Sequence, residues 1–216
     1  MRWLRKEFGI SRITLTGDSA GGNLATMAAV FACNEQALEK LKAVQYTGPD
    51  EDPFPEINGV LSMYGLLDRT SFFDKETEGI SKLEIALSRF ALDFIFGAYT
   101  GNEEFGHEVP QWKQPLQGRC TLCDWIGEMS EYPRTMLIVG SRDVLVHSSR
   151  KAHTMLQERG FKSTLLEYDA RHAFIGLPPA LNVGGTWRFH SKPATERAIQ
   201  FFDELSWSEE SERPQV

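Results

Sequence analysis

A short glycine-rich turn is the feature that most constrains how this chain can fold. The turn is Gly17-Asp18-Ser19-Ala20-Gly21-Gly22, and it lies between an apolar run over 13–15 and a helix-like run over 23–32. The order of strand, sharp turn and helix, with a serine at the turn, is that of a nucleophile elbow, Gly-x-Ser-x-Gly. Small neighbours let the backbone bend tightly enough to push the serine hydroxyl out of the sheet. We therefore expect Ser19 to be a nucleophile; the alternative is a glycine-rich turn without chemistry.

The same turn predicts a donor for an oxyanion. The helix after it directs its free N–H groups and the positive end of its dipole at the reacting centre. We therefore expect the backbone N–H of Ala20 to stabilise a negatively charged oxygen.

A serine nucleophile needs a base, and the base needs an acid that orients it. The elbow predicts the chain order Ser, then Asp or Glu, then His. Asp143 follows a buried-strand run over 135–140, and His172 follows the strand predicted over 163–168. Both residues thus lie beyond the C-terminal ends of strands, where open parallel sheets bind ligands. We interpret Asp143 as the acid and His172 as the base. The alternatives are a solvated or helix-capping aspartate and a histidine without a catalytic role.

The other histidines fit the role of the base less well. His147 is the main rival, because it lies only four residues from Asp143. On the acid's own loop, however, it would have difficulty reaching Ser19 while pairing with that acid. The remaining three lie in a polar loop, within a predicted helix and before the last helix: His107, His153 and His190.

The rest of the chain reads as an α/β architecture of parallel strands flanked by helices. The strands are predicted near 12–16, 57–63, 135–140 and 163–168. A long excursion over about 66–133 separates the second strand from the third, and it contains an apolar-periodic helix over 80–99. This helix is either a cap that lines an acyl pocket or an ordinary helix packed on the sheet.

Further helices are expected over 36–45, 148–159 and 193–205. Residues 206–216 are polar and acidic, so we expect a disordered tail there.

Composition narrows the function classes. A chain of 216 residues, 41% of them hydrophobic, can bury the core of one domain. Its net charge of −7 argues against nucleic acid or an anionic membrane as the main partner. No apolar run is long enough for a transmembrane segment. The N-terminus lacks a secretory apolar core, which favours the cytoplasm unless a targeting segment lies upstream.

The three cysteines cannot form an even disulfide framework. Cys33 lies on the apolar helix after the elbow and is expected in the core. Cys120 and Cys123 make one C-x-x-C pair without the second pair that completes a zinc site, so no metal is expected.

Three motifs in order resemble the hormone-sensitive-lipase-like group of α/β-hydrolase esterases, the alpha/beta hydrolase fold-3 family. Residues 17–24 match that family's elbow with high specificity, whereas 143–145 and 172–174 are weak alone and persuasive in order. Residues 3–13 resemble the helix and strand that lead into the elbow. Residues 58–68 resemble the following strand, which in the family often ends in Tyr-Pro and here ends in Tyr64-Gly65.

The resemblance covers residues 1–205 and implies an α/β-hydrolase domain. It further implies hydrolysis of carboxylic esters with short or medium acyl chains through an acyl-enzyme, without a cofactor. In that reaction Ser19 attacks the carbonyl, His172 takes and returns the proton, and Asp143 orients the imidazole. The substrate is a small-molecule ester.

The chain departs from the family in one respect. Members carry a His-Gly-Gly-Gly loop before the elbow, which supplies further oxyanion donors. Here the only other Gly-Gly pair is Gly184-Gly185, after the base. We therefore expect an N-terminally incomplete domain or a shortened protein, with the strand over 13–15 exposed as an edge that can self-associate.

Two alternatives to an esterase stay open. The first is a truncated or non-catalytic remnant or a small-molecule-binding module, a role that gibberellin receptors show for this fold. The second, favoured less by the residues around Ser19, is a peptidase of the prolyl oligopeptidase kind.

Overall fold

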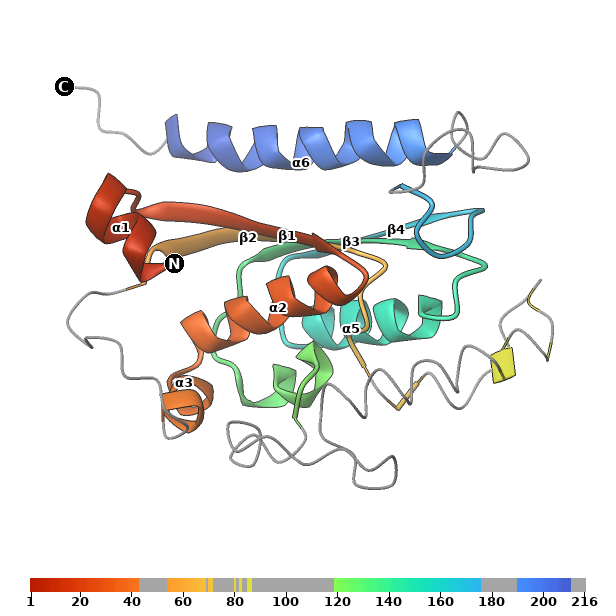
Figure 1. Ribbon diagram of the computed structural model, residues 1–216, viewed down its shortest axis with the longest axis horizontal. Coiled ribbons are helices and arrows are strands. Elements are labelled where there is room, and N and C mark those ends of the chain that lie inside the picture. Colours follow the sequence, from red (N-terminus) through yellow and green to blue (C-terminus); the bar gives the residue numbers. More distant parts are fainter. Residues whose placement is uncertain are drawn as a thin grey trace.

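A single parallel sheet forms the centre of the computed structural model, which describes residues 1–42, 54–68, 70–71, 80, 82, 85–86, 119–175 and 190–210. Its strands are β1 (Arg12–Asp18), β2 (Glu56–Met63), β3 (Arg134–Gly140) and β4 (Ser163–Tyr168). All neighbours pair in parallel, in the order β1-β2-β3-β4. Strands that follow one another in the chain are therefore neighbours in space, and their C-terminal ends share one edge (Figure 1). The predicted α/β fold class and its four parallel strands are confirmed.

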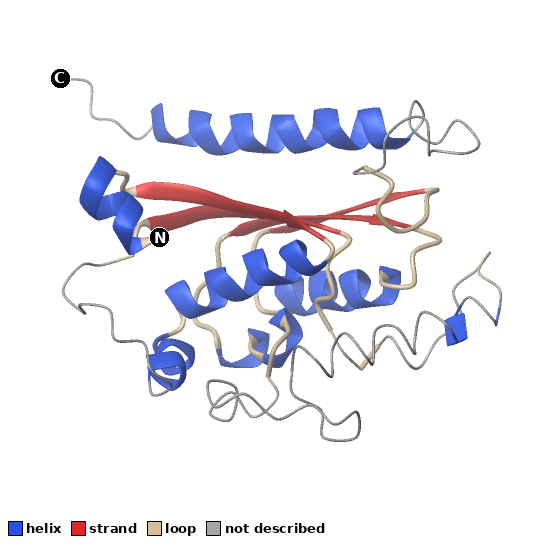
Figure 2. Cartoon of the chain, viewed as in Figure 1, coloured by secondary structure: helices blue, strands red, loops and turns tan. Residues whose placement is uncertain are grey.

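Helices cover both faces of this sheet (Figure 2). The described helices are α1 (Arg2–Phe8), α2 (Ala20–Cys33), α3 (Glu35–Lys42), α5 (Val146–Glu158) and α6 (Lys192–Glu210), with 3-10 turns η3 (Leu122–Asp124) and η4 (Ile126–Glu128). Figure 1 shows α6 alone above the sheet and α2 and α5 below it. No helix of the described residues is long and apolar enough to cross a membrane.

Alternation along the strands divides the core in two. On β3, Leu137 packs in the cluster between the sheet and helices α2 and α5, whereas its neighbours Met136 and Ile138 pack in the cluster between the sheet and α6. Successive side chains of a strand point to opposite faces, so a strand covered on both sides must be apolar throughout. This explains why 135–139 reads as a continuous buried run.

Two helices differ from the sequence prediction at their ends. The helix after the elbow begins at Ala20 rather than at residue 23, because packing of the elbow overrides the low helix propensity of its glycines. The last helix continues to Glu210, so 206–210 are helical rather than part of a disordered tail. No Gly or Pro interrupts them, and Ser206 Oγ donates a hydrogen bond to the Phe202 carbonyl at 2.8 Å. Residues 211–216 lie outside the described residues.

The other predicted helices agree where they can be compared. The structure has α3 over Glu35–Lys42 and α5 over Val146–Glu158. The end of the first prediction, 43–45, lies outside the described residues. The same is true of most of the cap-like excursion, of whose helix over 80–99 only residues 80, 82, 85 and 86 are described.

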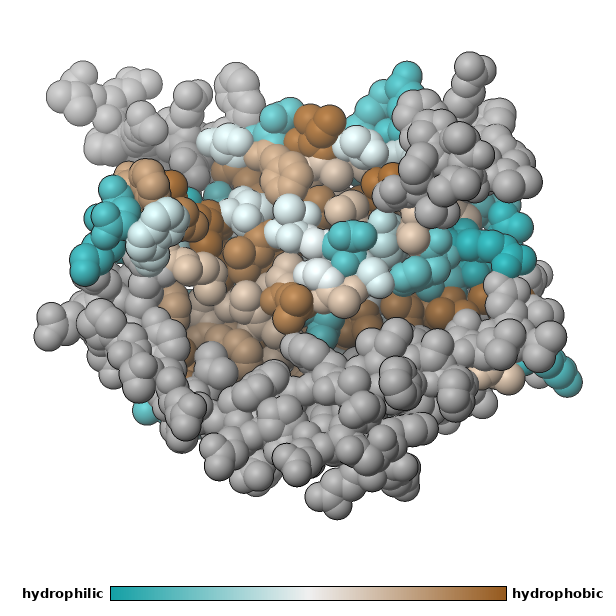
Figure 3. Space-filling model, viewed as in Figure 1, coloured by the Kyte–Doolittle hydropathy of each residue, from teal (hydrophilic) through white to brown (hydrophobic). Residues whose placement is uncertain are grey.

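β1 forms one edge of the sheet that the described residues build. Large apolar side chains near it are exposed, among them Trp3 and Phe8 of α1 and Leu24 of α2. Figure 3 shows hydrophobic residues, in brown, exposed near the middle of the side of the molecule that faces the viewer. An edge strand beside exposed apolar side chains offers a surface for a further strand.

Candidate active site

Ser19 lies in the turn between β1 and α2 with a backbone that serine rarely adopts. Its φ is 49° and its ψ is −119°, a conformation in which a side chain is strained. Backbone hydrogen bonds hold it there: its N–H donates to the Met63 carbonyl at 2.9 Å, and its carbonyl accepts from the Gly22 N–H at 3.0 Å and the Asn23 N–H at 3.3 Å. The strained turn is therefore fixed from β2 as well as from its own helix.

The glycines of this turn are not equivalent. A Cβ atom at Gly17 would meet the backbone O and C atoms of Gly21 and lie 2.8 Å from the Gly22 nitrogen. A Cβ at Gly22 would lie 2.6 Å from Ser62 Oγ and 3.1 Å from the Gly65 Cα. A Cβ at Gly21 would meet nothing closer than Asp18 Oδ1, at 4.0 Å. Close approach thus requires glycine at positions 17 and 22 but leaves room at 21.

The loops that carry the predicted acid and base touch each other. After β3, the Ser141 N–H donates to the Tyr168 carbonyl at 2.7 Å, and the Arg142 N–H donates to the Ala170 carbonyl at 3.0 Å. A Cβ at Gly140 would collide with the Ala170 carbonyl oxygen, so only glycine permits this approach. The loop after β3 is thereby held against the loop after β4.

The structure brings Ser19, Asp143 and His172 together. Ser19 Oγ lies 3.0 Å from His172 Nε2, and His172 Nδ1 lies 2.9 Å from Asp143 Oδ2. The Asp143 side chain is fully buried, and its Oδ1 accepts a hydrogen bond from the Leu145 N–H at 2.8 Å. An ionised carboxylate only accepts, so Nδ1 donates to it and Nε2 is left to accept the serine hydroxyl. This arrangement can move a proton from serine to imidazole.

Ala20 opens α2, so its N–H belongs to the first turn, whose donors have no acceptor within the helix. The residue is exposed beside Ser19. Its N–H is thus open to an oxygen atom at the serine.

The structure places the other histidines elsewhere. His147 lies in the first turn of α5, near Glu167, whose pKa is lowered mainly by a hydrogen bond from Arg150 and to a smaller extent by His147. His153 Nδ1 is 2.9 Å from Ser163 Oγ, and the ring of His190 packs on that of Tyr168. His107 lies outside the described residues.

Comparison with known proteins agrees with this arrangement of strands and loops. A family model described as alpha/beta hydrolase fold matches residues 1–176. The chain belongs to this family. No curated protein matches this alpha/beta hydrolase.

Solved structures of esterases share its fold. Esterase B from Lactobacillus Rhamnosis superposes with a TM-score of 0.63 at 19% identity, over 97% of this chain and 59% of that one. A fungal esterase from Rhizomucor miehei gives 0.58 at 19%, over 92% and 51%. Carboxyl esterase 2 from Tuber melanosporum gives 0.53 at 18%, over 92% and 57%. The chain thus spans between half and three fifths of the length of these proteins.

One residue at this alpha/beta hydrolase site was not found from the sequence. Tyr64, directly after β2, is 1% exposed, and its ring packs on that of His172 with centroids 5.1 Å apart. The only signal in the sequence was the likeness of Tyr64-Gly65 to the pair that ends this strand in the family.

The three cysteines are not part of the contacts that join Ser19, His172 and Asp143. All three are free, and burial, aided by Glu131, raises the pKa of Cys33 to about 11. Burial also raises the pKa of Cys123 far above its ordinary value. Within the described ranges, no group of three or more His, Cys, Asp and Glu residues is placed to hold a metal ion.

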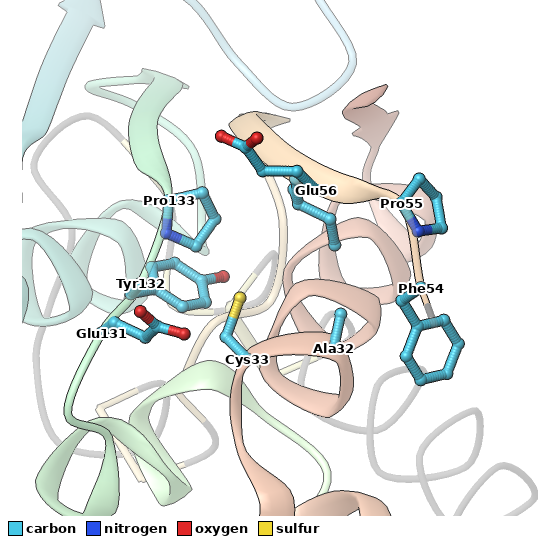
Figure 4. Close-up of a pocket in the computed structure, with 9 residues that line it drawn as sticks. Ala32, Cys33, Phe54, Pro55, Glu56, Glu131, Tyr132 and Pro133 are labelled. Carbon is cyan, nitrogen blue, oxygen red and sulfur yellow. The ribbon is translucent and has the colours of Figure 1, made fainter. Parts of the chain in front are cut away.

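A cavity of about 380 Å³ lies at the opposite end of the strands from Ser19. Figure 4 shows the residues that line it. It is bounded by the end of α2, the start of β2 and the segment before β3, at residues 32–33, 54–57 and 131–133. Tyr132, at its wall, donates a hydrogen bond to the Thr26 carbonyl at 3.0 Å, and Glu56 pairs with Arg12 at 3.1 Å. The cavity shares no residue with the cluster around Ser19.

Proposed function

We propose that this protein hydrolyses carboxylic esters through an acyl-enzyme formed on Ser19. The observation that carries the proposal is the continuous chain of contacts from Ser19 Oγ through the imidazole of His172 to the buried carboxylate of Asp143. Membership of the alpha/beta hydrolase fold family and the shared fold with esterases support it. Nucleophile, base and orienting acid are the three groups that a serine hydrolase needs.

Acylation begins when Ser19 Oγ attacks the ester carbonyl and His172 Nε2 takes its proton. The carbonyl oxygen becomes an oxyanion, which accepts a hydrogen bond from the Ala20 N–H. Asp143 holds the imidazolium in place through Nδ1 and stabilises its charge. The tetrahedral intermediate then collapses, the C–O bond to the alcohol breaks, and His172 gives the proton to the leaving oxygen.

Deacylation repeats these steps with water. His172 removes a proton from the water molecule as it attacks the acyl carbonyl, and a second tetrahedral intermediate forms. Its collapse releases the carboxylic acid and returns the proton to Ser19. Each cycle thus consumes one ester and one water and restores all three side chains.

We further propose substrates with short or medium acyl chains. This rests on the resemblance to the hormone-sensitive-lipase-like esterases. Esterase B from Lactobacillus Rhamnosis, which shares the fold, is inhibited by a C4-C4 tributyrin phosphonate. A butyryl ester is therefore the first substrate to test.

Turnover of p-nitrophenyl esters of increasing acyl length tests the proposal. We expect hydrolysis of the butyrate, a decline with long chains, and a loss of about 10⁴-fold or more in Ser19→Ala. Ser11→Ala, at an exposed serine before β1, is the matched control and should keep full activity. Unchanged turnover in a folded Ser19→Ala variant would overturn the serine mechanism. Saturable binding of the ester without turnover in the wild type would favour the binding module.

A further inference from the structure

The imidazole of His172 needs support beyond its two hydrogen bonds. Its side chain is 36% exposed, whereas the Asp143 carboxylate is fully buried. A contact at Nδ1 fixes one corner of the ring, but the ring can still tilt about that corner. The atom that must stay aligned with Ser19 is the opposite nitrogen, Nε2.

Tyr64 supplies a wall against that tilt. Its ring meets the imidazole at 66°, an edge-to-face geometry that aromatic rings prefer. Phe174 packs on the same tyrosine ring with centroids 5.9 Å apart, and both aromatic side chains are almost wholly buried. The wall is therefore itself held in place.

The backbone of Tyr64 is strained to present this ring. Among the described residues, three that are not glycine have positive φ: Ser19, Tyr64 and Ala173, at 49°, 41° and 61°. All three lie at the proposed site, as nucleophile, as contact of His172 and as its chain neighbour. Bulky residues rarely have a positive φ, because the conformation is strained. Such strain persists only where the surrounding structure enforces it, and it is concentrated at functional sites.

Two consecutive residues at the end of β2, Met63 and Tyr64, contact Ser19 and His172, respectively. The Met63 carbonyl accepts the Ser19 N–H at 2.9 Å. The next N–H, that of Tyr64, donates to the Ile138 carbonyl at 2.6 Å and ties the turn to β3. The end of β2 thus fixes the backbone of the serine and the ring of the histidine relative to each other.

We propose that Tyr64 is a positioning residue, whose aromatic ring holds the His172 imidazole between Ser19 and Asp143. The inference rests on the proposed ester hydrolysis and adds a residue to it. The ring carries the role, and the phenolic hydroxyl is not needed for it. Tyr64→Leu should therefore impair the base, whereas Tyr64→Phe should preserve it.

The experiment compares Tyr64→Leu and Tyr64→Phe with Tyr168→Leu, each in the full-length protein. Tyr168 packs on Phe174, with centroids 5.7 Å apart, so its loss removes a ring from the same aromatic cluster without touching His172. We expect Tyr64→Leu to lower kcat about 10- to 100-fold with little change in KM, since a small misplacement of a reacting group has this cost. Tyr64→Phe and Tyr168→Leu should turn over as the wild type does.

NMR of the His172 ring gives a readout that is independent of turnover. In the wild type and in Tyr64→Phe, the Nδ1–H tautomer should dominate; in Tyr64→Leu, the two tautomers should mix. Equal kcat and equal tautomers in Tyr64→Leu would overturn the proposal, and so would a loss in Tyr64→Phe as large as in Tyr64→Leu. If Ser19→Ala keeps full turnover, the proposed function fails, while the tautomers still decide whether Tyr64 positions the ring.

Discussion

Alanine at Gly17 and alanine at Gly21 should have opposite effects, although both glycines belong to the same Gly-x-Ser-x-Gly turn. The methyl group at position 17 would run into the backbone of Gly21 and Gly22. The methyl group at position 21 would point into open space, with its nearest neighbour at 4.0 Å. The first change should distort the elbow, and the second should be accepted.

The expected magnitudes follow from these contacts. Overpacking costs about 1–3 kcal/mol when the neighbours can shift. At Gly17 every contacted atom is backbone and has no rotamer to escape to, so the free energy of unfolding should fall by about 3 kcal/mol. Gly21 lies in the first turn of α2, where alanine is a better helix former than glycine. Gly21→Ala should therefore raise the free energy of unfolding by about 0.5–1 kcal/mol. The two variants should thus differ by about 3.5–4 kcal/mol.

Urea unfolding of both variants, followed by circular dichroism, measures this difference at constant m-value. Esterase turnover is recorded alongside, because a distorted elbow misplaces Ser19. We expect Gly17→Ala to unfold at much lower urea than the wild type and to lose activity. Gly17→Ala with wild-type stability, or Gly21→Ala as damaged as Gly17→Ala, would refute the description of this turn.

Three further outcomes are expected. Asp143→Asn should lower kcat by up to about 10⁴-fold with the fold intact, because an amide N–H facing Nδ1 favours the wrong histidine tautomer; near-normal kcat would contradict this. Burial alone would raise the pKa of Asp68, but hydrogen bonds led by Ser71 and Lys151 outweigh it and lower the pKa. Asp68 therefore stabilises the fold above its unfolded pKa and loses that effect as pH falls through its lower, folded pKa. Asp68→Asn should therefore be less stable at pH 7, and its stability should fall less than that of the wild type as the pH is lowered below about 4 in urea titrations. The protein should self-associate through β1, an edge strand of the described sheet, and Thr16→Lys on that strand should shift the sedimentation profile toward monomer; a monodisperse wild-type monomer would count against an open edge.

The sequence predicted the strands well because their signals are local. A run of apolar residues closed by glycine, as over 135–140, has few other interpretations. The topology then followed, since strands joined by helices form a parallel sheet whose C-terminal ends share one edge. That shared edge is why two loops 29 residues apart, at Asp143 and His172, were expected at one site with Ser19.

The details that the sequence did not predict depend on distances between segments. Gly17, Gly21 and Gly22 look alike in the sequence, and only the neighbours that a Cβ would meet separate them. The contact of Tyr64 with His172 joins residues more than a hundred positions apart and carries no local pattern. The longer last helix was missed because acidic residues were interpreted as a tail, although they are good helix formers.

The proposed ester hydrolysis requires that Ser19 is a nucleophile activated by His172. A fluorophosphonate probe, followed by intact mass and peptide mapping, measures this most directly, because the probe forms a covalent bond only with an activated serine. We expect one label per chain, on Ser19. The label should be absent in Ser19→Ala and form far more slowly in His172→Ala, whereas His147→Ala should be labelled as fast as the wild type. Labelling at another serine, or labelling of Ser19 at an unchanged rate in His172→Ala, would contradict this mechanism.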